Sequence, residues 1–316
     1  MPAPPARASH HDRLIDAAND TPPAPTAIVH PCDPASLQGA MAARDARLIL
    51  PVLVGPAARI AAAAAQAGID LTGLEVIDTP HSHAAADRAV GLVRAGRVEL
   101  LMKGSLHTDE LIAAILHPDT GLRTGRRISH VYIMDVPGHA ETLFITDAAI
   151  NIAPDLLTRA DIVRNAIELC HALGNPEPRV AILSAVETVT PKIPSTIDAA
   201  ALCKMADRGQ ITGALIDGPL AFDNAIDPEA ARIKGIVSPV AGRAQVLVVP
   251  DLEAGNMLAK NLTFLSRADA AGIVLGARVP VILTSRADSV RTRLASAAVG
   301  AILAAQRRAA RPIPQA

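Results

Sequence analysis

One stretch decides the fold class of this chain: Val246-Leu247-Val248-Val249-Pro250-Asp251-Leu252. A short apolar run meets a Pro-Asp turn, and the segment that begins near Leu252 carries Leu258, Leu262 and Leu265 at helical spacing. A buried strand, a turn and an amphipathic helix together form the repeating unit of parallel α/β sheets. The stretch therefore predicts an α/β protein.

The same alternation recurs along the chain. Further strand candidates, separated by longer helical stretches, are residues 27–29, 48–54, 99–102, 131–134, 180–183, 214–216 and 281–283. One helix is predicted to open at Pro154-Asp155 and to stop at Gly174. Half of the residues are apolar, yet there is no Trp, one Tyr and three Phe, so the core is expected to be aliphatic. Such cores are typical of sheets buried on both faces, and we expect the sheets to be mostly parallel.

Polar residues follow six of the strand candidates. They are Lys103-Gly104-Ser105, Asp135, Ser184, Asp217-Gly218-Pro219, Pro250-Asp251 and Thr284-Ser285-Arg286. Ligands of open α/β sheets bind at the carboxyl ends of the strands. A single polar residue there is commonly a helix cap or a turn, but six together indicate a binding site.

Length and charge narrow the function classes. A chain of 316 residues favours two domains, and its net charge of -1 gives no reason to expect nucleic acid or an anionic membrane as a partner. The motifs of P-loop kinases, dinucleotide-binding dehydrogenases, zincins and α/β-hydrolases do not occur. His81 with His83, and His10 with His11, lie in an Ala-rich segment and in the expected tail without a convergent set of ligands, so we expect no metal site.

The cysteines and the N-terminal residues 1–26 indicate the cellular compartment of the protein. Cys32, Cys170 and Cys203 are an odd, widely spaced set, which fits a reducing cytoplasm better than a disulfide framework. Residues 1–26 are rich in Pro and Ala and contain no continuous apolar segment, and no long uncharged run occurs elsewhere. We expect residues 1–26 to be a mobile tail and the protein to be cytoplasmic.

Five ordered segments carry a family resemblance. They are Leu101-Met102-Lys103-Gly104-Ser105-Leu106-His107-Thr108, residues 216–223, 238–244 and 249–256, and Leu283-Thr284-Ser285-Arg286-Ala287-Asp288-Ser289. Over about residues 27–310 the chain resembles the phosphate acetyl/butyryltransferase family, especially the transferase half of bifunctional enoyl-CoA hydratase/phosphate acetyltransferase proteins. The resemblance implies exchange of an acyl group between coenzyme A and phosphate, with acetyl as the first expectation. Butyryl or another short acyl group remains an alternative.

The resemblance also implies an architecture. It predicts an isocitrate/isopropylmalate dehydrogenase-like fold of two α/β domains, with residues 27–128 plus 273–316 forming an outer domain and 129–272 an inner domain. A cleft between them would hold Lys103 to Thr108 and Ser285 to Asp288 on one side, with Asp217 and Asp251 facing them. Members of the family usually form homodimers, so a homodimer is expected.

Residue types suggest the roles. The guanidinium of Arg286 offers a planar fork for phosphate, and the hydroxyl of Ser285 is a further donor. In the best-known family members an Asp six residues after this Arg resembles a general base; here that position is Thr292, and the candidates become Asp288 and His107. Candidate substrate-binding residues are Lys103, Gly104, Ser105, Thr108, Asp217, Asp251 and Asn256.

Two further expectations concern chemistry. Acyl-CoA and phosphate supply all reacting atoms, so no cofactor is expected beyond coenzyme A and phosphate as substrates. Thr292 at the family's base position also leaves open a different class of protein, a non-catalytic sensor that binds coenzyme A or an acyl phosphate.

Overall fold

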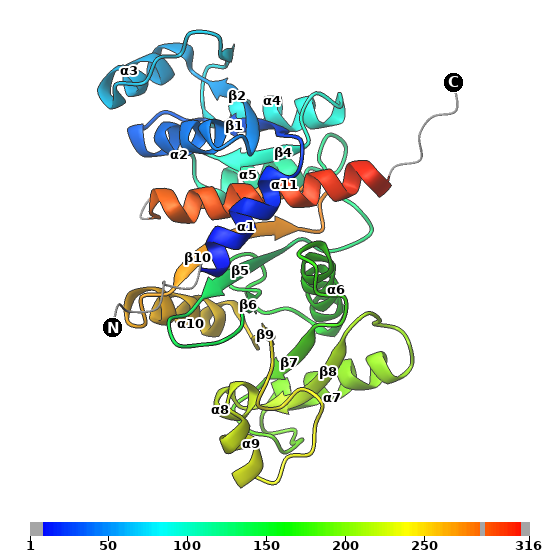
Figure 1. Ribbon diagram of the computed structural model, residues 1–316. Helices are drawn as coiled ribbons and strands as arrows, with labels where there is room; N and C mark the ends of the chain where they lie inside the picture. Colours follow the sequence, from blue (N-terminus) through cyan, green and yellow to red (C-terminus); the bar gives the residue numbers. More distant parts are fainter. Residues whose placement is uncertain (1–8, 285–287, 311–316) are drawn as a thin grey trace, which may run out of the picture. The chain divides into compact units, whose positions relative to one another are not determined.

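The computed structural model describes residues 9–284 and 288–310 (Figure 1). Its chain divides into two compact units. The terminal unit contains residues 1–121 and 281–316, and the central unit contains residues 122–280. Both chain ends therefore belong to the same unit.

A parallel sheet forms the terminal unit, with strand order β3-β2-β1-β4-β11. The strands are β1 (Ala24–Val29), β2 (Ile49–Gly55), β3 (Glu75–Asp78), β4 (Leu100–Lys103) and β11 (Val281–Ile282). The helices are α1 (His10–Asn19), α2 (Pro34–Asp45), α3 (Ala57–Ala67), α4 (Ser82–Arg94), α5 (Thr108–Leu116) and α11 (Val290–Ala310). Because all five strands are parallel, their carboxyl ends lie at one edge of this sheet.

The register of β11 matters for the site. Val281 pairs with Leu101 and Ile282 pairs with Met102, so β4 and β11 end side by side. Segments about 180 residues apart in the sequence thus leave the sheet as neighbours, Lys103 from one strand and Thr284 just beyond the other.

Residues 10–19 of the expected tail form helix α1. Helix α1 lies across α11 (Figure 1) and buries His11 and Ala18 completely. Ser9 and Asp12 form a capping box that satisfies the first amides of α1. The short polar-looking segment is therefore helical because its cap is strong and one face packs on α11.

The central unit has a mixed sheet with strand order β10-β5-β6-β9-β7-β8. Its strands are β5 (Ser129–Asp135), β6 (Leu143–Thr146), β7 (Arg179–Leu183), β8 (Leu215–Leu220), β9 (Val246–Val248) and β10 (Asp269–Leu275). Its helices are α6 (Leu156–Ala172), α7 (Pro194–Asp207), α8 (Phe222–Ile226), α9 (Pro228–Ile233) and α10 (Leu252–Phe264). Strands β6, β9, β7 and β8 are parallel, whereas β5 is antiparallel to both of its neighbours.

Two strand-end expectations in this unit are wrong. Asp135 ends β5, and because β5 runs against its neighbours, Asp135 pairs with Asp269 at the start of β10 and lies away from the carboxyl ends of the parallel strands. Asp217 does not follow a strand: β8 continues through Asp217-Gly218-Pro219 to Leu220, with a register shift against β7. β8 is the edge strand, where a proline and a bulge are tolerated.

The structure also differs from the sequence-based expectation in three strands and one boundary, and it confirms one helix. Strands β3, β6 and β10 were not predicted, and the expected boundary at residues 272/273 falls inside β10, whereas the contacts of the chain place it after Pro280. Helix α6 begins after its Asp155 cap and is followed by Gly174 at φ 86°, as predicted. Helix α10 ends at Phe264, so Leu265 is not on its buried face and is 78% exposed.

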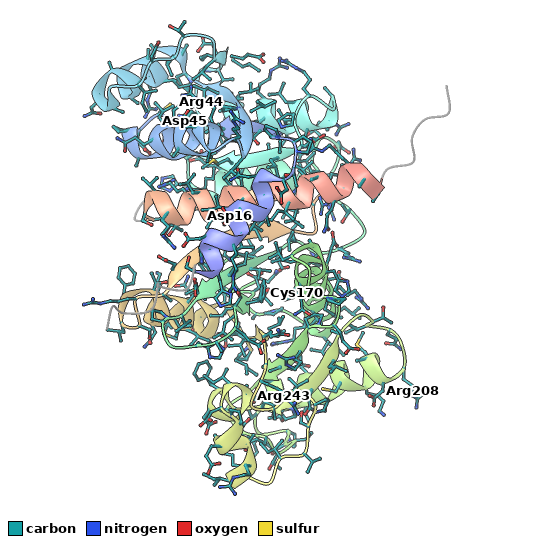
Figure 2. All side chains as sticks on the ribbon, viewed as in Figure 1. Asp16, Arg44, Asp45, Cys170, Arg208 and Arg243 are labelled. Carbon is teal, nitrogen blue, oxygen red and sulfur yellow. The ribbon has the colours of Figure 1, made fainter. Side chains whose placement is uncertain are left out.

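All three cysteines are free thiols. Cys170 lies on α6 inside the central unit (Figure 2) and is fully buried, which raises its pKa to about 12. Burial and the nearby carboxylate of Asp217 raise the pKa of Cys203 to about 12 as well. No helix in residues 9–284 and 288–310 is long and apolar enough to cross a membrane.

A buried histidine gives this fold a pH dependence. His130 on β5 is 1% exposed, its ring stands edge-on to Tyr132 at 4.4 Å between centroids, and desolvation lowers its pKa to about 3. The unfolded chain binds this proton near pH 6.5, so the unfolded state holds more protons throughout the window from about 6.5 down to 3. Stability contributed by neutral His130 is thus present above pH 6.5 and is lost as the pH falls.

We expect wild type to lose about 2 kcal/mol more unfolding free energy between pH 7 and pH 5 than His130→Gln does. Urea unfolding of both proteins at the two pH values measures this difference. Equal losses in the two proteins would show that His130 is accessible to protons in the folded state.

Candidate active site

The end of β4 is held tightly against the end of β1. The Gly104 amide donates to Val29 O (2.8 Å) and the Ser105 amide donates to His30 O (2.9 Å). A Cβ on Gly104 would lie 2.5 Å from Val29 O and 2.7 Å from His30 O, so only glycine fits. Gly104 therefore fixes the direction in which the chain leaves the sheet.

Ser105 is engaged within the protein. Its hydroxyl donates to His30 O (2.8 Å), accepts from the Cys32 amide (3.2 Å) and lies 3.2 Å from His30 Nδ1. These contacts join the loop after β4 to the loop after β1. The expected role of Ser105 as a substrate donor stays a prediction, and its observed role is to tie two loops of the strand-end edge together.

Lys103 and His107 differ in exposure. Lys103 is 6% exposed, and its Nζ donates to Gly104 O at 3.4 Å. His107 occupies the N-cap position of α5 without making a side-chain capping bond, and its ring is exposed to solvent; Thr108 is the first residue of the helix. His107 is thus exposed to solvent, whereas Lys103 is buried at the end of β4. The roles expected for both residues stay predictions.

The motif that follows β11 is described in part. Ser285 and Arg286 lie outside the described residues; Thr284 is buried and Asp288 is half-buried. The hydroxyl of Ser289 accepts from the Thr292 amide (3.1 Å) and lies 3.1 Å from Thr292 Oγ1. Thr292, at the position of the family's Asp, therefore belongs to the first turn of α11 and bonds to its cap.

The candidates in the central unit have structural partners. Asp251 caps α10 by accepting from the Ala254 amide (2.8 Å), and Asn256 Nδ2 donates to Ala148 O (3.2 Å). Asp217 is half-buried and accepts from the Gly218 amide (2.8 Å). Their substrate roles stay predictions.

A pocket that the sequence analysis missed opens at the strand-end edge of the terminal unit. It measures about 500 Å³ and is lined by His30, Cys32, Asp33, Pro34, Ala35, Arg59 and Ser105. His30 follows the predicted strand 27–29 directly, which is the same signal that identified Lys103 and Thr284. The pocket shares Ser105 with the predicted site, so both belong to one edge of one sheet.

Burial shifts the pKa values of two groups that line this pocket, His30 and Cys32. Desolvation, and secondly the positive charge of Arg59, hold the pKa of His30 below its usual value, while Glu110 acts in the opposite direction. Burial raises the pKa of the Cys32 thiol. A neutral imidazole and a protonated thiol are therefore the favoured states at neutral pH.

No cluster of three or more metal-ligating side chains occurs within the part of the chain that the structure describes.

Asp147 is the most buried carboxylate of the central unit, and its oxygens accept from the amides of Ala149, Ile150 and Asn151 at 3.0 to 3.1 Å. Burial raises its pKa, although these hydrogen bonds oppose the shift. Asp147 is accordingly a loop-organising residue.

Comparison with known proteins shows the family of the chain. Residues 83–301 match the family described as phosphate acetyl/butaryl transferase, which is more than half of the chain and includes the segments 101–108 and 283–289. The chain belongs to this family. It is 70% identical to a phosphate acetyltransferase of Rhizobium meliloti over 306 residues, covering 97% of each protein.

Further relatives carry other acyl groups in their names. The chain is 40% identical to a phosphate butyryltransferase of Clostridium beijerinckii, over 93% of this chain and 98% of that protein. The crystal structure of a branched-chain phosphotransacylase from Enterococcus faecalis superposes with a TM-score of 0.78 at 30% identity, covering 89% of this chain and 99% of the other. The mixed α/β fold is thus that of solved phosphotransacylases.

Proposed function

We propose that this protein is a phosphate acetyltransferase, which converts acetyl-CoA and phosphate to acetyl phosphate and coenzyme A. The observation that carries the proposal is 70% identity to a phosphate acetyltransferase along nearly the whole of both chains. That identity also argues against a non-catalytic sensor, because the relative that matches along 97% of both chains is named as an acetyltransferase.

The chemistry needs positioning and charge stabilisation. A phosphate oxygen attacks the thioester carbonyl, the C–S bond breaks after a tetrahedral oxyanion has formed, and the coenzyme A thiolate takes up a proton. We infer that Arg286 and Ser285 hold phosphate, while the positive charge of Lys103 favours the anionic transition state. Asp288 and His107 remain the two candidates for the group that accepts a proton from the coenzyme A thiol in the reverse direction.

Several finer expectations remain part of this proposal. The isocitrate/isopropylmalate dehydrogenase-like arrangement is supported by the terminal unit's being built from both chain ends. The exposed side chains of Met257, Phe264 and Leu265 on the central unit supply apolar area of the kind that a homodimer buries. A cytoplasmic location is supported by the three free thiols.

Acyl preference gives the test of this assignment. We expect kcat/KM to be highest with acetyl-CoA and to fall with propionyl-CoA and butyryl-CoA, because a misfitted methylene costs about 1 to 3 kcal/mol, or roughly 10- to 200-fold. Phosphate-dependent release of the coenzyme A thiol measures all three substrates. A higher kcat/KM for butyryl-CoA than for acetyl-CoA would reassign the protein as a butyryltransferase.

The same assay tests the expectation of no metal. Activity in excess chelator should equal activity without it, since phosphate is held by side chains. Loss of activity that one particular divalent metal restores would contradict that part of the proposal.

A further inference from the structure

The pocket beside His30 has no role in the chemistry assigned so far. Its volume of about 500 Å³ far exceeds the space that an acetyl group and a phosphate ion fill. All of its lining residues belong to the terminal unit. Pockets of this size commonly hold a small organic ligand or a large part of one. The pocket therefore has room for a further part of a substrate.

The backbone of His30 is held in a conformation that histidine rarely adopts. Its φ is 54°, in the left-handed region, where side chains other than glycine are strained. His30 O accepts three hydrogen bonds that hold it there, from the amides of Cys32 and Ser105 (both 2.9 Å) and from Ser105 Oγ (2.8 Å). Strain of this kind clusters at ligand sites, since it persists only where the surroundings enforce it.

The ring of His30 also contains a polar atom without a partner. The residue is 5% exposed, and its Nδ1 lies 3.2 Å from Ser105 Oγ. Its Nε2 is buried and has no hydrogen-bond partner among the residues that the structure describes. Buried polar atoms of native proteins are almost always hydrogen-bonded. Because His30 lines the pocket, a polar group of a ligand held there would supply the missing bond.

Arg59 gives the pocket a positive charge. It is an exposed residue in the first turn of α3, and within the described part of the chain it forms no ion pair or hydrogen bond. Its charge lowers the pKa of His30, after desolvation, and opposes the rise in the pKa of Cys32, so it lies close to both. The carboxylate of Asp33 is engaged as the cap of α2, where it accepts from the Ser36 amide (2.7 Å). The remaining cation suits an anionic group.

The spacing of the strands sets how far this charge lies from the ends of β4 and β11. Arg59 follows β2, and the order β11-β4-β1-β2 puts three strand spacings of about 4.8 Å, about 14 Å together, between the ends of β11 and β2. The pantetheine arm of coenzyme A has about as many bonds as four extended residues, which span about 14 Å. A thiol at the ends of β4 and β11 therefore leaves the nucleotide within reach of the pocket.

We propose that this pocket binds the nucleotide end of coenzyme A, with Arg59 in contact with one of its phosphate groups. His30 supplies a hydrogen bond to the same end of the molecule. Cys32, Pro34 and Ala35 form the less polar wall against which the ribose or the base packs. The inference rests on the proposed function, and it names a part of the acyl-CoA site that the reaction itself does not reveal.

Arg59→Ala tests the charge. We expect kcat/KM for acetyl-CoA to fall by about 5- to 20-fold, the lower end of the value of a hydrogen bond to a charged group, because Arg59 is exposed. KM for phosphate should change by less than about twofold, and so should kcat/KM for acetylpantetheine, which carries the thioester without the nucleotide. Arg88→Ala is the matched control, since Arg88 is exposed on α4 of the same unit and does not line the pocket. It should leave all three values within about twofold of wild type.

Ala35→Phe tests the volume of the pocket without changing a charge. Ala35 is exposed in the first turn of α2, so the variant should fold. A phenyl ring there should raise KM for acetyl-CoA and leave KM for acetylpantetheine unchanged. Ala61→Phe, at an exposed position of α3 outside the lining, should raise neither.

Adenosine 3′,5′-bisphosphate distinguishes coenzyme A from a free nucleotide as the occupant of the pocket. We expect it to compete with acetyl-CoA, to inhibit Arg59→Ala more weakly than wild type, and to leave acetylpantetheine turnover unchanged. Inhibition of acetylpantetheine turnover that Arg59→Ala relieves would make the pocket a regulatory site and overturn the assignment. Equal losses of kcat/KM for acetyl-CoA and acetylpantetheine in Arg59→Ala would overturn it as well, because the residue would then act through the fold.

Calorimetric titration with coenzyme A keeps this inference separate from the proposed function. A wild-type protein without phosphate-dependent turnover would contradict the proposed function. The inference would still hold if wild type and Arg88→Ala bound coenzyme A more tightly than Arg59→Ala did. Equal binding by all three proteins, or binding by none, would overturn it.

Discussion

Replacing Arg286 with alanine is expected to lower kcat/KM for phosphate by roughly 30- to 1000-fold. In the sequence only Thr284 and Ser285 separate Arg286 from the apolar strand predicted at residues 281–283. In the structure β11 ends beside β4, at the edge where the chain leaves the sheet through Lys103 and Gly104. Removal of a charge-assisted anion clamp costs on the order of 2 to 4 kcal/mol of transition-state stabilisation. Loss of an exposed arginine that binds nothing costs far less.

Arg286→Lys isolates the fork from the charge. A lysine keeps the positive charge but does not bind phosphate through two parallel N–H groups, so we expect it to be badly impaired as well. Arg97→Ala is the control, because Arg97 pairs with Glu75 at the surface of the same unit. Retention of more than about a third of wild-type kcat/KM by Arg286→Ala, a loss below about 1 kcal/mol, would show that Arg286 is not the clamp.

Gly104→Ala is expected to destabilise the terminal unit by about 1 to 3 kcal/mol and to lower activity with it. The new Cβ would meet the backbone oxygens of Val29 and His30 below 3 Å, and backbone cannot rotate away as a side chain can. Relief of the clash requires the ends of β1 and β4 to separate, which would break the hydrogen bond that the Gly104 amide donates to Val29 O. Urea unfolding and kcat/KM for both substrates measure the two effects.

Gly91→Ala is the matched control for that variant. Gly91 lies inside α4 of the same unit, and a Cβ there meets nothing within 4 Å. Alanine should stabilise this helix by about 0.5 to 1 kcal/mol. If Gly104→Ala matched Gly91→Ala in stability and activity, the close approach of β4 to β1 would not constrain the site.

The fold class was accessible from the sequence because the strands are apolar and the helices are well capped. Val246-Leu247-Val248 followed by the Asp251 cap is a strand, a turn and a helix in the structure, as predicted. Strand β10 was missed because Gly272 interrupts a run that reads as the end of a helix. The direction of β5 was also missed, since strand direction is set by pairing partners and not by local sequence.

The sequence contains a capping signal for helix α1. Ser9 and Asp12 stand at capping-box spacing, and the structure shows both reciprocal bonds. The buried face of α1 depends on α11, which is some 280 residues away in the sequence. Composition alone therefore favoured a tail.

The site was predicted in part, because the sequence shows which residues follow strands but not which partners those residues have in the fold. Lys103 ends β4, Gly104 follows it directly and Thr284 lies just beyond β11. The pairing of β4 with β11 brings these strand ends together. Asp251 and Asn256 are engaged in capping and loop contacts that spacing does not reveal. The pocket around His30 was overlooked although the same strand-end rule applies to it, and Arg59 joins it only through the placement of α3.

The central claim is that this protein makes acetyl phosphate, and the most direct test is to detect that product. Purified protein is incubated with acetyl-CoA and phosphate, and acetyl phosphate and the free coenzyme A thiol are both quantified over time. We predict that the two products accumulate in equal amounts and that omission of phosphate abolishes both. Coenzyme A release that is independent of phosphate, or the absence of acetyl phosphate at every phosphate concentration, would contradict the account.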